Sequence, residues 1–318
     1  MNFVLPAAAK GRADIARAFA HLAGLFSEIP PEGTDPIAYM RQQVERYGRA
    51  DPADTVPGME VRPVSADGIP CEWLLPEDWR EGPAARLVFL HGGGWAAGSL
   101  DSHRALAAAH ARRLGYPLLL VDYSLAPENP FPVALEECAK ALAWARHHGP
   151  DGPGRTAMLG LAGDSAGGNY AAAITVKGIE QGLEVPDRLL LLSAALELST
   201  DPGRRDIEDP LNDYERQQVQ FPVIQAVYVQ GKTAAEDPLV SPLRASDETL
   251  AQFPPTLLQV SNSEFLLWDA EQFARKLIAN GVRTNLSVWP GLPHVWQFFA
   301  FLPESAAALA EAATFLTP

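Results

Sequence analysis

Most of the chain after residue 85 alternates short apolar runs with longer amphipathic segments. A run of a few consecutive apolar residues is typical of a strand buried on both faces, whereas apolar residues three or four positions apart indicate a helix. The predicted strands are Leu87–Leu90, Leu118–Val121, Ala157–Ala162, Leu189–Leu192, Thr256–Val260 and Leu286–Trp289. The predicted helices are Leu106–Leu114, Ala134–Arg146, Asn169–Gln181, Ala270–Ala279 and Glu304–Leu316. This alternation predicts a mostly parallel sheet with helices on both faces.

The first part of the chain has a different pattern. Apolar residues at helical spacing predict helices over Gly11–Ala23 and Pro36–Tyr47, before any strand. From Met59 the spacing changes to two, and the segments Met59–Pro63 and Cys71–Leu75 flank an Asp-Gly turn signal. These two segments are therefore predicted to form an antiparallel hairpin.

Residues 197–235 interrupt the alternation of strands and helices. This stretch lies between two predicted strands and contains no strand of its own that would extend the series. We interpret it as a lid inserted into the α/β arrangement.

Composition limits the class of protein. A chain of 318 residues with 47% hydrophobic residues is long enough for one large α/β domain or two smaller ones. No apolar run approaches the ~18 residues of a membrane span, and the N-terminus lacks the basic and apolar regions of a signal peptide, so a cytoplasmic location is expected. The net charge of -14 disfavours nucleic acid as a partner.

The chain has two cysteines, Cys71 and Cys138. They could form at most one bridge, and their spacing matches no metal site. We predict two buried structural thiols, no metal and no cofactor.

The segment Gly163-Asp-Ser-Ala-Gly167 matches the G-x-S-x-G pattern of a nucleophile corner. Its glycines allow a turn so tight that the serine hydroxyl stands exposed between a strand and a helix. The pattern alone is common, but a predicted strand precedes it and a predicted helix follows it. Ser165 is therefore the candidate nucleophile.

The segment His91-Gly-Gly-Gly-Trp95 directly follows the predicted strand Leu87–Leu90. Consecutive glycines leave backbone N–H groups unshielded, as the stabilisation of a developing oxyanion requires. With the N–H after the nucleophile, the expected donors are Gly93, Gly94 and Ala166. His91 is expected to brace this loop rather than to catalyse.

A serine nucleophile also needs a base, and α/β-hydrolases carry it after the serine and the acid in chain order. Of the seven histidines, only His294 follows Ser165. His294 is therefore the candidate base.

Two carboxylates compete for the role of the acid. Glu264 and Asp269 both follow the predicted strand Thr256–Val260, where catalytic groups gather in open α/β sheets. Glu264 is closer to the strand and is preferred. Asp269 precedes the predicted helix Ala270–Ala279, where an N-capping role would explain an aspartate without catalysis.

Five segments together resemble the bacterial hormone-sensitive-lipase-like esterases and occur in that family's order. They are His91–Trp95, Asp122–Pro132, Gly163–Asn169, Asp237–Pro242 and Pro290–His294. The resemblance implies an α/β-hydrolase core of about eight strands over residues 51–196 and 236–318. It also implies a helical cap built from residues 1–50 and 197–235. The family usually has aspartate where Glu264 stands, arginine where Ser124 stands, and a Pro and an Asp within residues 194–197.

The resemblance further implies hydrolysis of short-chain carboxylic esters through an acyl-enzyme, with neither metal nor cofactor. Trp95, Phe221 and Tyr228 are the residues expected to contact substrate. A homodimer through the edge strand Leu286–Trp289 is a further hypothesis. An amidase or formamidase, a longer-chain lipase and a non-catalytic ligand-binding relative are the alternatives.

Overall fold

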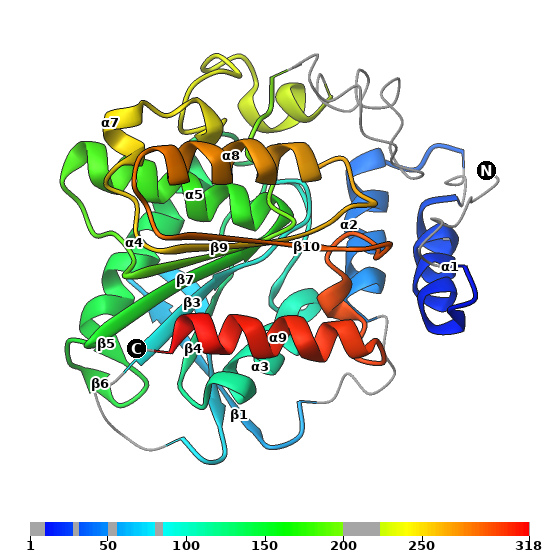
Figure 1. The fold of residues 1–318 in the computed structure, drawn as a ribbon, viewed down its shortest axis with the longest axis horizontal. Coiled ribbons are helices and arrows are strands. Elements are labelled where there is room, and N and C mark those ends of the chain that lie inside the picture. The colour runs from blue at the N-terminus through cyan, green and yellow to red at the C-terminus, as the bar shows by residue number, and fades with distance from the viewer. Residues whose placement is uncertain (1–9, 28–31, 50–55, 80–84, 200–222, 318) are drawn as a thin grey trace.

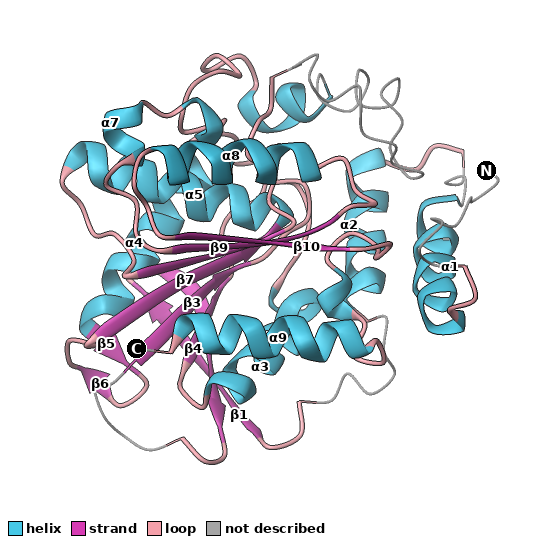
Figure 2. Cartoon of the chain, in the orientation of Figure 1, coloured by secondary structure: helices cyan, strands magenta, loops and turns pink. Residues whose placement is uncertain are grey.

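The computed structural model describes residues 10–27, 32–49, 56–79, 85–199 and 223–317. Within these ranges an eight-stranded sheet forms the centre of the molecule (Figures 1 and 2). Its strands are β1 (Met59–Ala66), β2 (Ile69–Pro76), β3 (Ala85–Leu90), β4 (Leu118–Val121), β7 (Met158–Asp164), β8 (Arg188–Leu192), β9 (Thr256–Ser261) and β10 (Thr284–Trp289). Their order across the sheet is β1-β2-β4-β3-β7-β8-β9-β10. A separate small hairpin pairs β5 (His148–Gly149) with β6 (Gly152–Pro153).

The strands from β4 to β10 in that order are parallel to one another, whereas β2 is antiparallel to both β1 and β4. The turn between β1 and β2 lies at Asp67, whose φ of 49° is left-handed, and Gly68. Both the mostly parallel sheet and the antiparallel hairpin predicted from the sequence are confirmed.

Helices cover both faces of the sheet. In Figure 1, α4, α5 and α8 lie above the sheet and α3 and α9 lie below it, while α1 and α2 stand beside one end. Their bounds are α1 (Ala13–Ser27), α2 (Pro36–Gly48), α3 (Leu100–Leu114), α4 (Val133–His147), α5 (Ser165–Gln181), α8 (Leu267–Ala279) and α9 (Pro303–Leu316). A short helix, α7 (Asp247–Leu250), precedes β9.

The apolar strands divide their side chains between two cores. Val88 and Leu90 of β3 belong to the core beneath α4 and α5, whereas Leu87 and Phe89 belong to the core beside α3 and α9. Successive side chains of a strand point to opposite faces, so a strand covered on both faces reads as a continuous apolar run.

Three helices begin earlier than the sequence pattern predicts. The first turn of α3 is polar, and the start of α5 contains two glycines, so neither shows apolar periodicity. In α8 the predicted cap is wrong, because the helix begins at Leu267 and Asp269 lies inside its first turn.

Two parts of the predicted cap are described. The helices α1 and α2 occupy much of residues 1–50, and Gln225–Val229 forms a π-helical turn within residues 197–235. Residues 200–222, including Phe221, lie outside the described residues. The boundaries of core and cap stay a prediction.

Both cysteines are buried free thiols, as predicted. None of the helices that the structure describes is both long and apolar enough to cross a bilayer.

Candidate active site

The candidate nucleophile stands at the junction of β7 and α5. Ser165 has a left-handed φ of 51° and is partly exposed, while its neighbours on both sides are buried. A Cβ on Gly163 would overlap the carbonyl of Gly167, and a Cβ on Gly167 would overlap the carbonyl of Leu90. Glycine is therefore required at both flanking positions, and the sharp turn presents the hydroxyl at the C-terminal edge of the sheet.

The loop of residues 91–98, called the oxyanion loop after its predicted role, follows β3 and lies beside this corner. Gly93 and Gly94 both have positive φ, at 125° and 60°, and a Cβ on Gly93 would overlap the backbone of Ala97. Within the described part of the chain, neither of their N–H groups donates a hydrogen bond. The N–H of Ala166 lies in the first turn of α5, where helical geometry offers no backbone acceptor. These three donors are available to an oxygen atom placed between the loop and Ser165.

Buried polar groups hold the oxyanion loop from below. The N–H of Gly92 donates to Asp164 Oδ1 at 3.0 Å and to His103 Nε2 at 3.2 Å, and His103 Nε2 lies 3.5 Å from Asp164 Oδ2. The hydroxyl of Tyr123 donates to the carbonyl of His91, whose ring stacks on that of Tyr123 at 4.1 Å. Burial lowers the pKa of His91 to about 3, so its imidazole stays neutral and serves to brace the loop.

The candidate base and acid meet at the same edge. His294, after β10, has its Nδ1 2.5 Å from Oε2 of Glu264, which follows β9. The other carboxylate oxygen, Oε1, accepts from the hydroxyl of Ser193 and the N–H of Ser261, both at 2.7 Å. The Glu264 side chain is only 3% exposed, whereas that of His294 is 32% exposed. A neutral His294 paired in this way carries its proton on Nδ1 and leaves Nε2 as the acceptor.

The end of β8 connects this pair to the nucleophile. The N–H of Ala195 donates to the carbonyl of Ser165 at 3.2 Å, and the N–H of Val295 donates to Ser193 Oγ at 3.4 Å. Ser193 therefore touches both Glu264 and the loop of residues 290–295 that carries His294, which we call the base loop. Because β7, β8, β9 and β10 are neighbours in the sheet, the loops that follow them converge.

Asp269, the second candidate acid, has a different role. Its Oδ2 accepts hydrogen bonds from the N–H groups of Leu196 at 2.8 Å and Glu197 at 3.0 Å, and the side chain is fully buried. The carboxylate thus holds the segment after β8, which explains an aspartate here without catalysis. Residues 194–197 are one of the places where the sequence departs from the family it resembles.

The structure describes two of the three residues predicted to contact substrate, Trp95 and Tyr228. Trp95, directly after the glycines, stacks on Tyr228 with ring centroids 5.2 Å apart, and both side chains are buried. The indole Nε1–H of Trp95 donates to Asn169 Oδ1 at 3.3 Å. Phe221 lies outside the described residues. Contact of these side chains with substrate stays a prediction.

Sequence reasoning missed the polar residues that support the site. Asp164 lies inside the serine motif, and a buried strand end is a signal that could have drawn attention to it. His103 and Tyr47 lie on α3 and α2, and no local pattern marks them, because the contacts they make are with distant loops. The hydroxyl of Tyr47 donates to the carbonyl of His294. Among the described residues, no three His, Cys, Asp or Glu side chains are grouped as a metal site would require.

Known proteins were compared with the chain. A family model described as the alpha/beta hydrolase fold matches residues 87–298. An esterase of Acinetobacter venetianus is 32% identical over 82% of this chain and 83% of its own length. An acetyl-hydrolase of Streptomyces hygroscopicus is 32% identical over 88% of each chain. The crystal structure of an esterase from the bacterial hormone-sensitive lipase family has a TM-score of 0.82 and 33% identity, and covers 96% of this chain and 97% of that one.

Proposed function

This chain belongs to the hormone-sensitive-lipase-like family of α/β-hydrolases and is a carboxylic ester hydrolase, and we propose that it works through an acyl-enzyme on Ser165. The observation that carries the mechanism is the contact between His294 Nδ1 and Glu264 at the edge where Ser165 is exposed. That contact orients the imidazole so that Nε2, not Nδ1, is the nitrogen that accepts a proton from a hydroxyl.

In the first step Ser165 Oγ attacks the ester carbonyl carbon while His294 Nε2 takes the hydroxyl proton. The carbonyl oxygen becomes negative and is stabilised by the N–H groups of Gly93, Gly94 and Ala166. Collapse of the tetrahedral intermediate expels the alcohol, which leaves with the proton from Nε2.

In the second step water attacks the acyl group and gives its proton to His294 Nε2. The oxyanion forms again against the same N–H groups. When the carboxylic acid leaves, Ser165 recovers its proton from His294. Throughout the cycle Glu264 stabilises the positive imidazolium by accepting its Nδ1–H.

An organophosphate tests the nucleophile directly. Wild type is expected to be labelled once per chain, and Ser165→Ala is expected to escape labelling and lose about 10⁴-fold or more in kcat on a p-nitrophenyl ester. Ser246→Ala, which alters only the N-cap of α7, serves as the control and should be labelled normally. Retention of activity in Ser165→Ala would disprove the proposal, and folded wild type that resists labelling would indicate a non-catalytic binding protein.

For the substrate we propose short acyl chains. The relative named an acetyl-hydrolase supports this, as does the large Trp95 and Tyr228 pair filling the interior beside the oxyanion loop. In a p-nitrophenyl series from acetate to laurate, kcat/KM should peak early, since a further methylene helps by ~0.8 kcal/mol only while there is room to bury it. A rise through laurate would identify a lipase, and faster cleavage of matched anilides would identify an amidase.

Three other expectations stay predictions. β10 is an edge strand whose Val288 is 44% exposed, so a homodimer pairing two copies of Leu286–Trp289 remains our proposal for the assembly. A cytoplasmic location and a cap formed from residues 1–50 and 197–235 are likewise proposed.

A further inference from the structure

The helix α2 contacts both the oxyanion loop and the base loop, although no motif in the sequence marks it. We propose that α2 is a strut that fixes the separation of these two loops, with Arg41 and Tyr47 as its positioning residues. The proposal rests on the mechanism above, because the strut matters only if both loops act on one substrate.

Arg41 forms the first end of the strut. Its Nε donates to the carbonyl of Ala96 at 2.8 Å, inside the oxyanion loop, and its Nη2 donates to the carbonyl of Ala126 at 3.1 Å. Glu128 accepts from Nη1 at 2.9 Å and from Nη2 at 2.6 Å, which orients the guanidinium. Arg41 thus joins the loop after β3 to the loop after β4 through one planar group, a geometry that lysine cannot reproduce.

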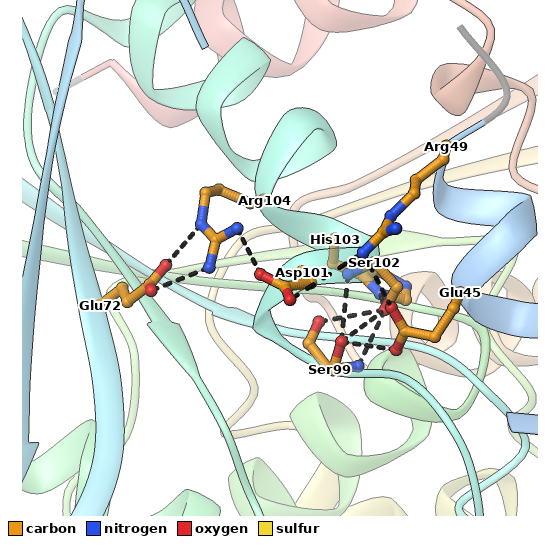
Figure 3. Close-up of polar contacts among 8 residues, drawn as sticks. All are labelled: Glu45, Arg49, Glu72, Ser99, Asp101, Ser102, His103 and Arg104. Atoms are coloured by element: carbon orange, nitrogen blue, oxygen red, sulfur yellow. Dashed lines mark hydrogen bonds and ion pairs between the residues drawn. The ribbon is translucent and has the colours of Figure 1, made fainter. Parts of the chain in front are cut away.

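The middle of α2 packs on the same loop. A Cβ on Gly94 would come within 2.7 Å of Met40 Cε, so the methionine lies directly against one of the proposed oxyanion donors. One turn later Glu45 accepts a hydrogen bond of 2.6 Å from Ser99, the N-cap of α3 (Figure 3). In the first turn of α3, Ser102 Oγ lies 2.8 Å from His103 Nδ1. The other ring nitrogen, His103 Nε2, accepts a hydrogen bond from the N–H of Gly92.

Tyr47 forms the second end. Its hydroxyl donates to the carbonyl of His294, across 247 residues of sequence. The ring is buried against Phe298 and Phe299, at centroid distances of 4.9 Å and 5.9 Å. Burial raises the pKa of Tyr47 well above its ordinary value, so the phenol keeps its proton and remains a donor at neutral pH.

The two ends lie six residues apart on a helix, or about 9 Å along its axis. A helix is stiff over this length, so it transmits the position of one loop to the other. Oxyanion donors contribute only when they are aimed at the position that the oxygen reaches in the transition state. Release of either end is therefore expected to reduce kcat more than it changes KM.

The variants Arg41→Ala and Tyr47→Phe test the strut, with kcat expressed per serine titrated by organophosphate so that unfolded protein does not count. Each is expected to lower kcat about ten-fold with KM within about two-fold, since transition-state stabilisation alone is lost. Arg62→Ala is the matched control for arginine, because Arg62, like Arg41, donates to a carboxylate, that of Glu60, and to a backbone carbonyl, that of Pro150. Tyr116→Phe is the control for tyrosine, because its hydroxyl also donates to a distant carbonyl, that of Leu316. Both controls should match wild type.

The double variant distinguishes a strut from two separate contacts. When one end is free the other can no longer set the separation, so the combined loss in kcat should be smaller than the product of the single losses. A multiplicative loss, or single variants with wild-type kcat per titrated site, would overturn the proposal. Wild type that fails to react with organophosphate would instead overturn the proposed function on which it rests.

Discussion

The carboxylate of Glu264 is held by three donors: the His294 imidazole, the Ser193 hydroxyl and the Ser261 N–H. The family that the sequence resembles usually has the shorter aspartate here. In this chain the extra methylene is accommodated because the carboxylate reaches back to the backbone at the end of β9 while its other oxygen faces the base. Both oxygens are satisfied, as the burial of this group requires.

Substitution of each carboxylate by its amide separates the two candidate acids. Glu264→Gln keeps the shape but removes the charge that stabilises the imidazolium, so kcat should fall by about 10³-fold to 10⁴-fold. Asp269→Asn weakens the bonds to the N–H groups of Leu196 and Glu197, so it should cost about 1–3 kcal/mol of unfolding free energy and leave kcat within about ten-fold of wild type. Ester kinetics and urea unfolding measure both quantities. If Asp269→Asn were the crippled variant, the acid would be misassigned.

At the scale of single residues, the sequence predicts a residue more readily when a motif or the chain order of the triad limits the choice than when the residue only supports the site. Ser165 and His294 could be predicted because a motif and the order of the triad leave one choice each, and their catalytic roles stay predictions. The backbone donors that Asp269 binds, the N–H groups of Leu196 and Glu197, could not be predicted, because they lie some seventy residues earlier and only the fold brings them close. His103 and Asp164 were missed as a pair for the same reason.

At the scale of elements, the contact between α2 and α3 is close enough to require a glycine. A Cβ added to Gly48, the last residue of α2, would overlap the carbonyl oxygen of Ser102 in the first turn of α3. The backbones of two helices meet here with no side chain between them. The same turn of α3 carries Ser102 and His103, which support the oxyanion loop.

Gly48→Ala and Gly24→Ala should therefore change stability in opposite directions. Gly24, in α1, has open space around its missing Cβ, so alanine there should raise the unfolding free energy by about 0.5–1 kcal/mol through helix propensity. Gly48→Ala should lower it by about 1–3 kcal/mol, because the backbone must move. Thermal or urea unfolding measures both, and stabilisation by Gly48→Ala would show that the contact is not as close as described.

Strands were easier to predict from the sequence than helix starts. A buried parallel strand is a continuous apolar run, and the predicted β4 agrees with the structure at both ends. By contrast α3 starts at Leu100 with a polar turn capped by Ser99, where apolar spacing gives no signal. Nothing in the sequence of α2 indicated what it would touch.

At the scale of the whole molecule, buried histidines make the unfolding free energy depend on pH. Burial lowers the pKa of His110, in α3, to about 4, and its Nε2 makes no hydrogen bond with the described residues. Because the folded-state pKa lies below the unfolded value of about 6.5, the unfolded chain takes up a proton that the folded chain cannot. The contribution of neutral His110 to the unfolding free energy is therefore fully present above about pH 6.5 and is lost progressively as the pH falls toward 4.

His110→Leu should flatten this acid dependence. Between pH 7 and pH 5 the wild type should lose up to about 2 kcal/mol of unfolding free energy for His110 alone, and the variant should lack that share. His147→Leu, at an exposed position near the end of α4, is the control and should keep the wild-type pH dependence. Urea unfolding at the two pH values measures the difference, and parallel losses in wild type and His110→Leu would refute the assignment.

The bond from Tyr47 to His294 also has a kinetic consequence for how the chain matures. A contact between residues so far apart must wait for a large loop to close, and such contacts form slowly. We expect the sheet between them to form first, because its strands can pair before the two distant segments meet. Full catalytic activity is then expected late in folding, and during refolding the last part of the esterase activity should return after the far-ultraviolet signal of the sheet has recovered.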